Sequence, residues 1–383
     1  MSGEIFSMET NYLKNNESSQ CYGCGICKFK CPVNAINMCK NKKGFLYPRI
    51  DQAKCIGCGI CERVCPIEIH REKNNFIIYQ AASKNVEILI RSQCGGVFSE
   101  LSKHVFKQNG VVYGAILDLK DFVVKHVRAA GEQSGKLMCT SKYVQSVITS
   151  EIYRQLESDL KNKRIVLFTG TPCQCAAIKK NYEQYENLIV CDFICHGVPS
   201  PELWERYLKY ISEKHNIVIK KAVFRNKRCR KLGNHTESYW SDKGDEYWEN
   251  DYAALFYSHL AHRDSCFRCQ FACTNRYSDI TMGGFLEPSI FEAKYDSSML
   301  IVNTEKGGKI FSDIKLNLNW TESKLKYYKN QPCLYHPVPK PDAYKIFWDD
   351  WQKLQIKEIL DKYATDEIKE KFHIRILKPG EEY

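Results

Sequence analysis

The chain has 383 residues, of which 44% are hydrophobic and 20 are cysteines. This length allows two or three domains, and the composition suffices for a globular core. The formal net charge is +11, but no nucleic-acid-binding motif accompanies it, so we expect no nucleic-acid partner. Residues 1–20 lack an apolar signal segment, and no apolar run reaches the roughly 20 residues that span a bilayer. We therefore expect a cytoplasmic protein whose cysteines serve metal and redox chemistry rather than disulfides.

Two cysteine runs follow a lead-in at residues 1–20 that we expect to be flexible. They comprise Cys21, Cys24, Cys27 and Cys31, and then Cys55, Cys58, Cys61 and Cys65. Each run has the C-x2-C-x2-C-x3-C-P spacing of bacterial two-cluster ferredoxins, in which the fourth cysteine binds the other cluster. Zinc and disulfides fit this spacing less well. The sequence therefore predicts one [4Fe-4S] cluster on Cys21, Cys24, Cys27 and Cys65, and another on Cys55, Cys58, Cys61 and Cys31.

From residue 76 the pattern changes to alternating strands and helices. Apolar runs predict strands at 76–81, 111–117, 122–127, 164–169 and 188–193. Periodic segments predict helices at 96–108, 143–160, 174–182, from Ser200 onward, and at 344–363. We therefore expect an α+β ferredoxin-like two-cluster domain at 21–75, then an α/β flavin-binding domain with a mostly parallel central sheet at 76–340, and a C-terminal helical segment at 341–383.

Four polar or glycine-rich islands lie at the expected strand ends and helix starts. They are residues 92–101, 140–146, 168–174 and 192–201. A helix N-terminus attracts anions, and open α/β sheets bind ligands at the carboxyl ends of their strands. On that ground we include Gly170 and Thr171 among the cofactor-binding residues. Ordinary helix starts remain an alternative for the first two islands. For His196 we favour a turn or hydrogen-bonding role over proton handling.

Cysteines beyond the two runs predict a further metal site. Cys173 and Cys195 end neighbouring strands, and Cys266 and Cys269 form a C-x2-C pair. Four thiolates can hold a third [4Fe-4S] cluster; zinc stays an alternative, and Cys273 is a rival ligand. The cysteines without an assigned role are Cys39, Cys94, Cys139, Cys175, Cys191, Cys229, Cys273 and Cys333. The basic stretch at 225–231 is either a solvated loop or a site for a phosphate, an acidic substrate or an acidic partner.

Taken together, the islands resemble the coenzyme F420 hydrogenase/dehydrogenase beta-subunit family, and in particular a bacterial branch with an N-terminal two-cluster ferredoxin domain. The resemblance rests on residues 94–101, 112–115, 141–146, 167–174, 195–201, 265–269 and 278–283. The resemblance implies FAD and a third [4Fe-4S] cluster held by Cys173, Cys195, Cys266 and Cys269. It also implies that Gly95, Gly96, Val97, Ser141, Lys142 and Tyr143 lie near the flavin. Many members exchange hydride with coenzyme F420.

Two departures from the family pattern stand out. Cys94 occupies a position where members commonly have serine, and Gly283-Gly284-Phe285 replaces Gly-Asp-Phe. We expect an iron–sulfur flavoprotein oxidoreductase that passes electrons between a ferredoxin-type or deazaflavin carrier and an organic substrate. The alternative is a non-catalytic electron-transfer protein that docks an acidic partner enzyme through basic residues. These are Lys28, Lys30, Lys42 and Lys43. A third possibility, a redox sensor, lacks a supporting motif.

Overall fold

The structure is a computed structural model that describes residues 19–69, 75–226, 236–284 and 297–374. Most of the lead-in, Cys229 with most of the basic stretch, and Phe285 lie outside the described residues. Along the described residues, no helix combines the length and the apolarity that a membrane crossing requires.

The N-terminal unit holds both cysteine runs. Its elements are α1 (Ile26–Lys30), β1 (Ile36–Lys40), β2 (Leu46–Ile50), α2 (Ile60–Arg63) and the 3-10 turn η1 (Pro66–Glu68). β1 and β2 pair antiparallel. Each run enters its short helix through a glycine in the left-handed region, Gly25 at φ 79° and Gly59 at φ 67°. Glycine adopts this conformation without steric cost, so the repeated sequence produces the same turn twice.

A mixed β-sheet forms the centre of the molecule. In the described part of the chain it has eight strands in the order β13-β3-β12-β11-β7-β6-β4-β5. Their bounds are β3 (Ile77–Ser83), β4 (Val111–Asp118), β5 (Val123–Ala129), β6 (Val166–Gly170), β7 (Leu188–Phe193), β11 (Ile280–Gly284), β12 (Ser298–Val302) and β13 (Leu318–Ser323). The adjacent strands β4, β6, β7 and β11 are parallel, and β3 shares their direction. The predicted α/β architecture is therefore confirmed, with antiparallel strands extending the sheet on both sides.

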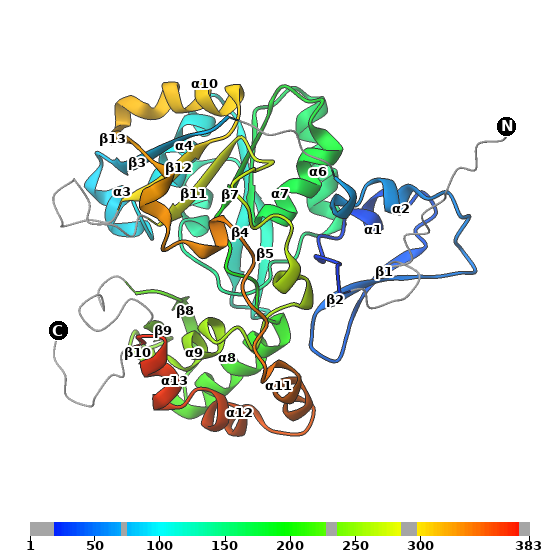
Figure 1. The fold of residues 1–383 in the computed structure, drawn as a ribbon, viewed down its shortest axis with the longest axis vertical. Coiled ribbons are helices and arrows are strands. Elements are labelled where there is room, and N and C mark those ends of the chain that lie inside the picture. Colours follow the sequence, from blue (N-terminus) through cyan, green and yellow to red (C-terminus); the bar gives the residue numbers. More distant parts are fainter. Residues whose placement is uncertain (1–18, 70–74, 227–235, 285–296, 375–383) are drawn as a thin grey trace.

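Helices cover both faces of this sheet (Figure 1). They are α3 (Val86–Arg91), α4 (Val97–Lys107), α5 (Glu132–Gly135), α6 (Ser150–Lys161), α7 (Pro172–Tyr182) and α10 (Glu305–Ile314). Side chains of α6 and α7 pack on one face around Tyr113 and Phe168. Side chains of α4 and α10 pack on the other face around Val112 and Leu167. Neighbouring strand residues thus point into opposite cores, as pleating requires.

A smaller region lies beside the sheet domain (Figure 1). It contains α8 (Pro201–His215), β8 (Ile219–Val223), β9 (Glu237–Ser241), β10 (Glu246–Glu249), α9 (Asp251–Tyr257), α11 (Tyr344–Trp351), α12 (Ile356–Tyr363) and α13 (Asp366–Lys371). Short 3-10 turns are η2 (Lys136–Met138), η4 (Asp264–Arg268), η5 (Lys315–Asn317), η6 (Leu325–Tyr328) and η7 (Pro332–Leu334). Trp204 and Trp351, from distant helices, are both buried in its core. The C-terminal helices therefore complete this core.

Two of the predicted helices were wrong in extent. The helix expected at 143–160 begins only at Ser150, because the Thr149 side chain caps it by accepting a hydrogen bond from Ile152 N. The preceding segment is extended, and Val147 forms a bridge to Lys125. The helix expected at 344–363 is interrupted between α11 and α12, where Gln355 caps the second helix. Apolar periodicity continued through both segments, and N-terminal capping residues set where α6 and α12 begin.

Candidate functional site: three groups of cysteines

The first group of cysteines lines one small enclosed cavity in the N-terminal unit. The four lining cysteines are Cys21, Cys24, Cys27 and Cys65. Burial raises the pKa of the Cys24 thiol, and the neighbouring Cys65 and Cys21 raise it further. Lys180 on α7 donates a hydrogen bond to Cys65 O, which ties the second run to the central domain. The structure thus brings together the four cysteines predicted for one cluster, and this donor set fits a [4Fe-4S] cube.

The second group lies at the outer end of the N-terminal unit. Cys55 and Cys58 are exposed, whereas Cys31 and Cys61 are half-buried and pack in one apolar cluster around Ile36. Burial raises the pKa of the Cys61 thiol, and Cys55 contributes to the rise. Cys31 from the first run and cysteines of the second run, all predicted to hold the same cluster, therefore meet near the surface. A cluster held here would be accessible to an external electron carrier.

The lysines expected to dock a partner divide into two kinds. Lys30 pairs with Glu157, and Lys43 Nζ lies 2.7 Å from an Asp264 carboxylate oxygen. Lys28 and Lys42 are exposed. Lys28 and Lys42 are therefore the more available of the predicted docking residues, whereas Lys30 and Lys43 also stabilise internal contacts.

The third group comes from loops that follow two parallel strands and from one 3-10 turn. Cys173 lies in the first turn of α7, directly after β6, and Cys195 follows β7. Cys266 lies in η4 and Cys269 caps it. Burial raises the pKa of the Cys269 thiol, and Cys173 and Cys195 add to the rise. Burial likewise raises the pKa of Cys266, to which Cys269 and Cys173 contribute. The four predicted thiols therefore lie together.

Two other cysteines near this group differ in their surroundings. The Cys273 Sγ lies 3.5 Å from Gln270 O and 3.1 Å from Asn275 O, at the periphery of the loop. Cys333, by contrast, contributes to the raised pKa of Cys195. Its Sγ lies 3.4 Å from His196 Nδ1. Sequence reasoning missed Cys333 as a neighbour because it lies far along the chain from Cys195 and shares no ligand spacing with it.

The positions of the side chains also bear on the zinc alternative. Across the residues that the structure describes, no three His, Cys, Asp or Glu side chains converge on the position of one metal ion. A cube is held by thiolates at separate iron atoms, so its ligands need not converge on one point.

The first and third groups are neighbours. Cys173 contributes to the raised pKa of Cys24. Tyr22 lines the first cavity, and burial raises its pKa with contributions from Cys269 and Cys173 of the third group. The buried Tyr22 ring packs against Phe271 with a centroid distance of 5.2 Å. Cys27 of the first group packs in one apolar cluster with Cys31 and Cys61 of the second. The three groups therefore form a sequence in space, from the second group through the first to the third.

The glycine island is tightly packed against the sheet. Gly96 caps α4 with φ 77°, and Val97 begins the helix. A Cβ on Gly95 would lie 2.3 Å from Ala81 O and 2.7 Å from Ser298 N. The strands β3 and β12 therefore already explain why residue 95 is glycine, independently of any ligand.

We expect Gly95→Ala to lower the free energy of unfolding by about 1–3 kcal/mol, because the strand backbone must move to accept the methyl group. Chemical denaturation of the apoprotein measures this change. Gly131→Ala is the matched control, since nothing lies within 4 Å of a Cβ there. A loss below about 0.5 kcal/mol for Gly95→Ala would contradict the packing argument.

The remaining predicted flavin residues approach one another beyond the carboxyl ends of the strands. Tyr143 stacks on Phe256 at 4.2 Å between ring centroids, and its hydroxyl lies 3.5 Å from Arg225 Nη1. Burial opposes ionisation of Arg225, but Tyr143, Tyr257 and Cys94 together raise its pKa. The islands that carry Cys94 and Tyr143 therefore meet at the Arg225 guanidinium.

Lys142 and Gly170 lie close to His126. His126 Nε2 lies 2.9 Å from Thr169 O, and burial lowers its pKa to about 4, with a smaller contribution from Lys142. A Cβ on Gly170 would be 3.3 Å from the same His126 nitrogen. Burial lowers the pKa of Lys142 itself to about 7, and Lys142 Nζ donates to Leu137 O at 2.9 Å.

Ser141 and Thr171 complete the predicted set. Ser141 is half-buried beside Lys142 in the chain. Thr171 caps α7, and its Oγ1 lies 3.1 Å from Cys173 Sγ. Thr171 therefore contacts the third cysteine group directly.

The two departures from the family pattern are adjacent in space. A Cβ on Gly284 would lie 3.7 Å from Cys94 Sγ, an ordinary van der Waals distance. Gln331 donates a hydrogen bond to Gly284 O at 3.0 Å. Because an acidic side chain at 284 would lie against position 94, the glycine makes this corner of the region less acidic than the family pattern.

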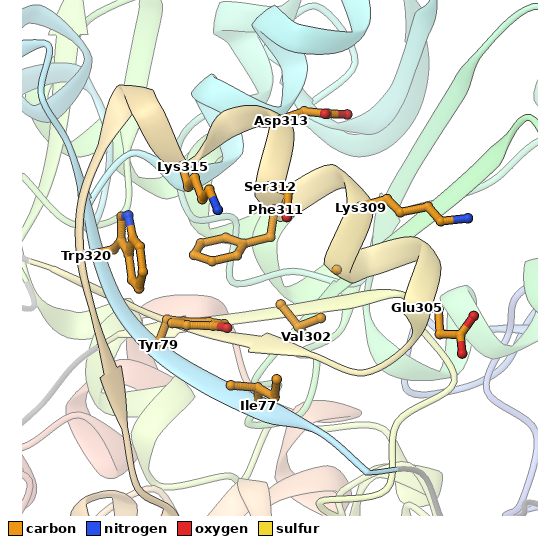
Figure 2. A pocket seen from close by; sticks show the side chains of 11 residues that line it. Ile77, Tyr79, Val302, Glu305, Lys309, Phe311, Ser312, Asp313, Lys315 and Trp320 are labelled. Atoms are coloured by element: carbon orange, nitrogen blue, oxygen red, sulfur yellow. The ribbon is translucent and has the colours of Figure 1, made fainter.

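A separate open groove of about 670 Å³ lies between α10 and the strands β3, β12 and β13 (Figure 2). Tyr79, Phe311 and Trp320 contribute packed aromatic rings to its wall. None of the cysteine groups or predicted flavin residues lines this groove. The groove is therefore separate from the three cysteine groups.

These features define an iron–sulfur electron-transfer protein with a two-cluster domain joined to a mixed α/β domain. Residues 20–69 match the 4Fe-4S dicluster domain. Residues 163–326 match the family described as the C terminus of the coenzyme F420 hydrogenase/dehydrogenase beta subunit. The predicted resemblance to this family is therefore confirmed over residues 163–326, behind a 4Fe-4S dicluster domain at residues 20–69.

One solved structure similar to this chain is the F420-reducing [NiFe] hydrogenase complex from Methanosarcina barkeri. A chain of that complex is 18% identical, with a TM-score of 0.45, and the match covers 76% of this chain and 90% of that chain. No curated protein matches the sequence.

Proposed function

We propose that this chain is an iron–sulfur flavoprotein oxidoreductase that passes electrons between a ferredoxin-type or deazaflavin carrier and an organic substrate. Three [4Fe-4S] clusters and FAD would carry the electrons. The spatial order of the cysteine groups is the observation that supports the proposal best. Exposed Cys55 and Cys58 mark one end, and the third group, at the strand ends, marks the other.

Each cysteine group would hold one cluster, and FAD would convert between two-electron and one-electron transfer. The chain supplies the insulation and the short path. Tyr22 excludes water between the first and third groups, since it is buried against Phe271. The Lys180 contact to Cys65 O fixes the first group against the central domain.

The region around Tyr143, Lys142 and Arg225 fits an anionic, planar cofactor. Arg225 provides a guanidinium next to an aromatic ring, and Lys142 provides an ammonium whose pKa burial has lowered. A bound phosphate would stabilise the charged form of Lys142. FAD carries both a flat ring system and a diphosphate, so it suits this combination.

Anaerobic purification of the full chain, followed by iron, sulfide and flavin analysis, tests the proposal. We expect about twelve iron atoms and one FAD per chain from three clusters and one flavin. Reduced carriers, with and without deazaflavin, should then bleach the flavin. About four iron atoms without flavin would overturn the proposal.

Binding of FAD should depend on pH through Lys142. Above pH 7 the free protein loses the Lys142 proton, and binding of the diphosphate must recapture it. We therefore expect the affinity of the apoflavoprotein for FAD to fall about tenfold per pH unit above about pH 7. Flavin fluorescence titrations at a series of pH values measure this dependence. Lys142→Arg should flatten the profile because arginine stays charged, and a flat profile in the unmodified protein would contradict the assignment.

The alternative function is a non-catalytic electron-transfer subunit that feeds a partner enzyme. The exposure of Cys55 and Cys58 favours contact with another redox protein. Turnover by the isolated chain would exclude this alternative. Co-purification with an enzyme, without turnover by the chain alone, would support it.

A further inference from the structure

We propose that Arg263 is a shared counter-ion of the first and third clusters, and that its charge raises the reduction potentials of both. Arg263 acts here as a positioning and tuning residue, since it holds no cluster itself. This inference rests on the proposed function, because it presupposes clusters on both cysteine groups.

Arg263 is among the largest fully buried side chains and is 1% exposed. All of its hydrogen-bond acceptors are neutral oxygens. Nε donates to Cys21 O at 2.7 Å, Nη1 donates to Gln145 Oε1 at 3.1 Å, and Nη2 donates to Leu46 O at 2.9 Å. The guanidinium carbon also lies 3.9 Å from the centre of the Tyr47 ring. The group is therefore rigidly held inside the protein.

Arg263 contacts both cysteine groups, the first through its guanidinium and the third through its backbone. Its contact with Cys21 O places it on the backbone of the first group. The Arg263 carbonyl accepts a hydrogen bond from Cys266 N of the third group at 2.9 Å. Burial raises the pKa of the Cys173 and Cys266 thiols, and the charge of Arg263 opposes the rise at both. The same cation therefore acts on both groups.

The charge of Arg263 has no carboxylate partner in the described part of the chain, where no ion pair to this residue occurs. The neighbouring carboxylate, Asp264, pairs with Lys43 and Lys340 instead. A buried charge is costly unless another charge compensates it. A cube with four thiolates is anionic, so clusters on the two groups would supply the missing negative charge. One-electron reduction makes a cluster more negative, and a nearby cation stabilises that state.

A purely mechanical role for Arg263 is the competing explanation. A Cβ on Gly23 would lie 2.9 Å from Arg263 Nη1, so the arginine also clasps the first cysteine loop against the central domain. Substitutions can separate the electrostatic effect of Arg263 from its mechanical hold on the first cysteine loop. Arg263→Lys keeps the charge but loses the fork of hydrogen bonds. Gln145→Glu keeps the arginine and places a carboxylate against its guanidinium.

The experiment is a redox titration of the anaerobically purified full chain, followed by EPR. We expect Arg263→Gln to lower the equilibrium constants for reduction of the first and third clusters at least tenfold. For a one-electron couple this is a fall in reduction potential of about 59 mV. Gln145→Glu should shift both in the same direction. Arg263→Lys should leave the equilibrium constants for reduction of these two clusters within about twofold of the unmodified protein. The reduction potential of the second cluster should stay the same in every variant. Arg154→Gln, which removes an exposed charge on α6, is the matched control.

The outcomes separate the alternatives. Unchanged reduction potentials in folded, iron-replete Arg263→Gln would overturn the inference. A shift in Arg263→Lys as large as that in Arg263→Gln would also overturn it, because it would indicate a mechanical role for the arginine rather than an effect of its charge. If Arg263→Gln does not fold, Gln145→Glu decides by the same criterion. Iron analysis of the unmodified protein is done first. An unmodified chain without the first and third clusters would refute the proposed function itself, whereas a full iron content with unmoved potentials refutes the role of Arg263 alone.

Discussion

Cys173→Ser should remove the third cluster and leave the two N-terminal clusters in place. We expect the iron content to fall from about twelve to about eight atoms per chain, because three thiolates and a hydroxyl do not hold a stable cube. Cys173 is suited to this test because it lies close enough to raise the pKa of the other three thiols of the third group, Cys266, Cys269 and Cys195. Flavin reduction by a reduced carrier should be lost with the cluster. Iron analysis and EPR measure the first effect, and anaerobic stopped-flow absorbance measures the second.

Cys273→Ser is the matched control for this result. Cys273 was a rival ligand by sequence, but its sulfur lies against the backbone oxygens of Gln270 and Asn275. We expect this variant to keep about twelve iron atoms. If Cys173→Ser retained all three EPR signals, or if Cys273→Ser lost one, the ligand set of the third cluster would have to be revised.

Cys65→Ser should abolish the first cluster, although Cys65 belongs to the second cysteine run. The reason is that Cys65 lines the cavity of the first group, together with Cys21, Cys24 and Cys27. We expect a loss of about four iron atoms per chain and an interruption of electron flow at the middle of the relay. The second cluster, near the surface, should still be reduced by an external carrier and remain visible by EPR.

Cys39→Ser serves as the control, since Cys39 lies in β1 outside both runs, opposite Tyr47 in the β1–β2 ladder. It should retain all clusters. Loss of the second cluster signal in Cys65→Ser, with the first intact, would show that each run holds its own cluster and would refute the crossed arrangement.

The N-terminal unit could be predicted because its information is local. The positions of Cys21, Cys24 and Cys27 within one short loop dictate their proximity through chain geometry alone, and Gly25 permits the turn. The parallel core was also predictable, because buried strands such as β6 and β7 are continuous apolar runs. Local capping, which apolar periodicity does not reveal, decided that α6 begins at Ser150 and α12 at Ile356.

The flavin region shows why the rest could not be predicted. Arg225, two residues after β8, meets Tyr143 through tertiary packing, and no spacing in the chain encodes that contact. The proximity of Cys333 to His196 is of the same kind.

By itself, the sequence determined the ligand types, the spacing within each cysteine run and the alternation of strands and helices, because these depend on neighbours along the chain. Only the tertiary structure decided that the first and third groups are adjacent and that the buried Arg263 contacts both of them. Such contacts join loops separated by more than two hundred residues, and they are set by packing of the whole domain rather than by any local preference.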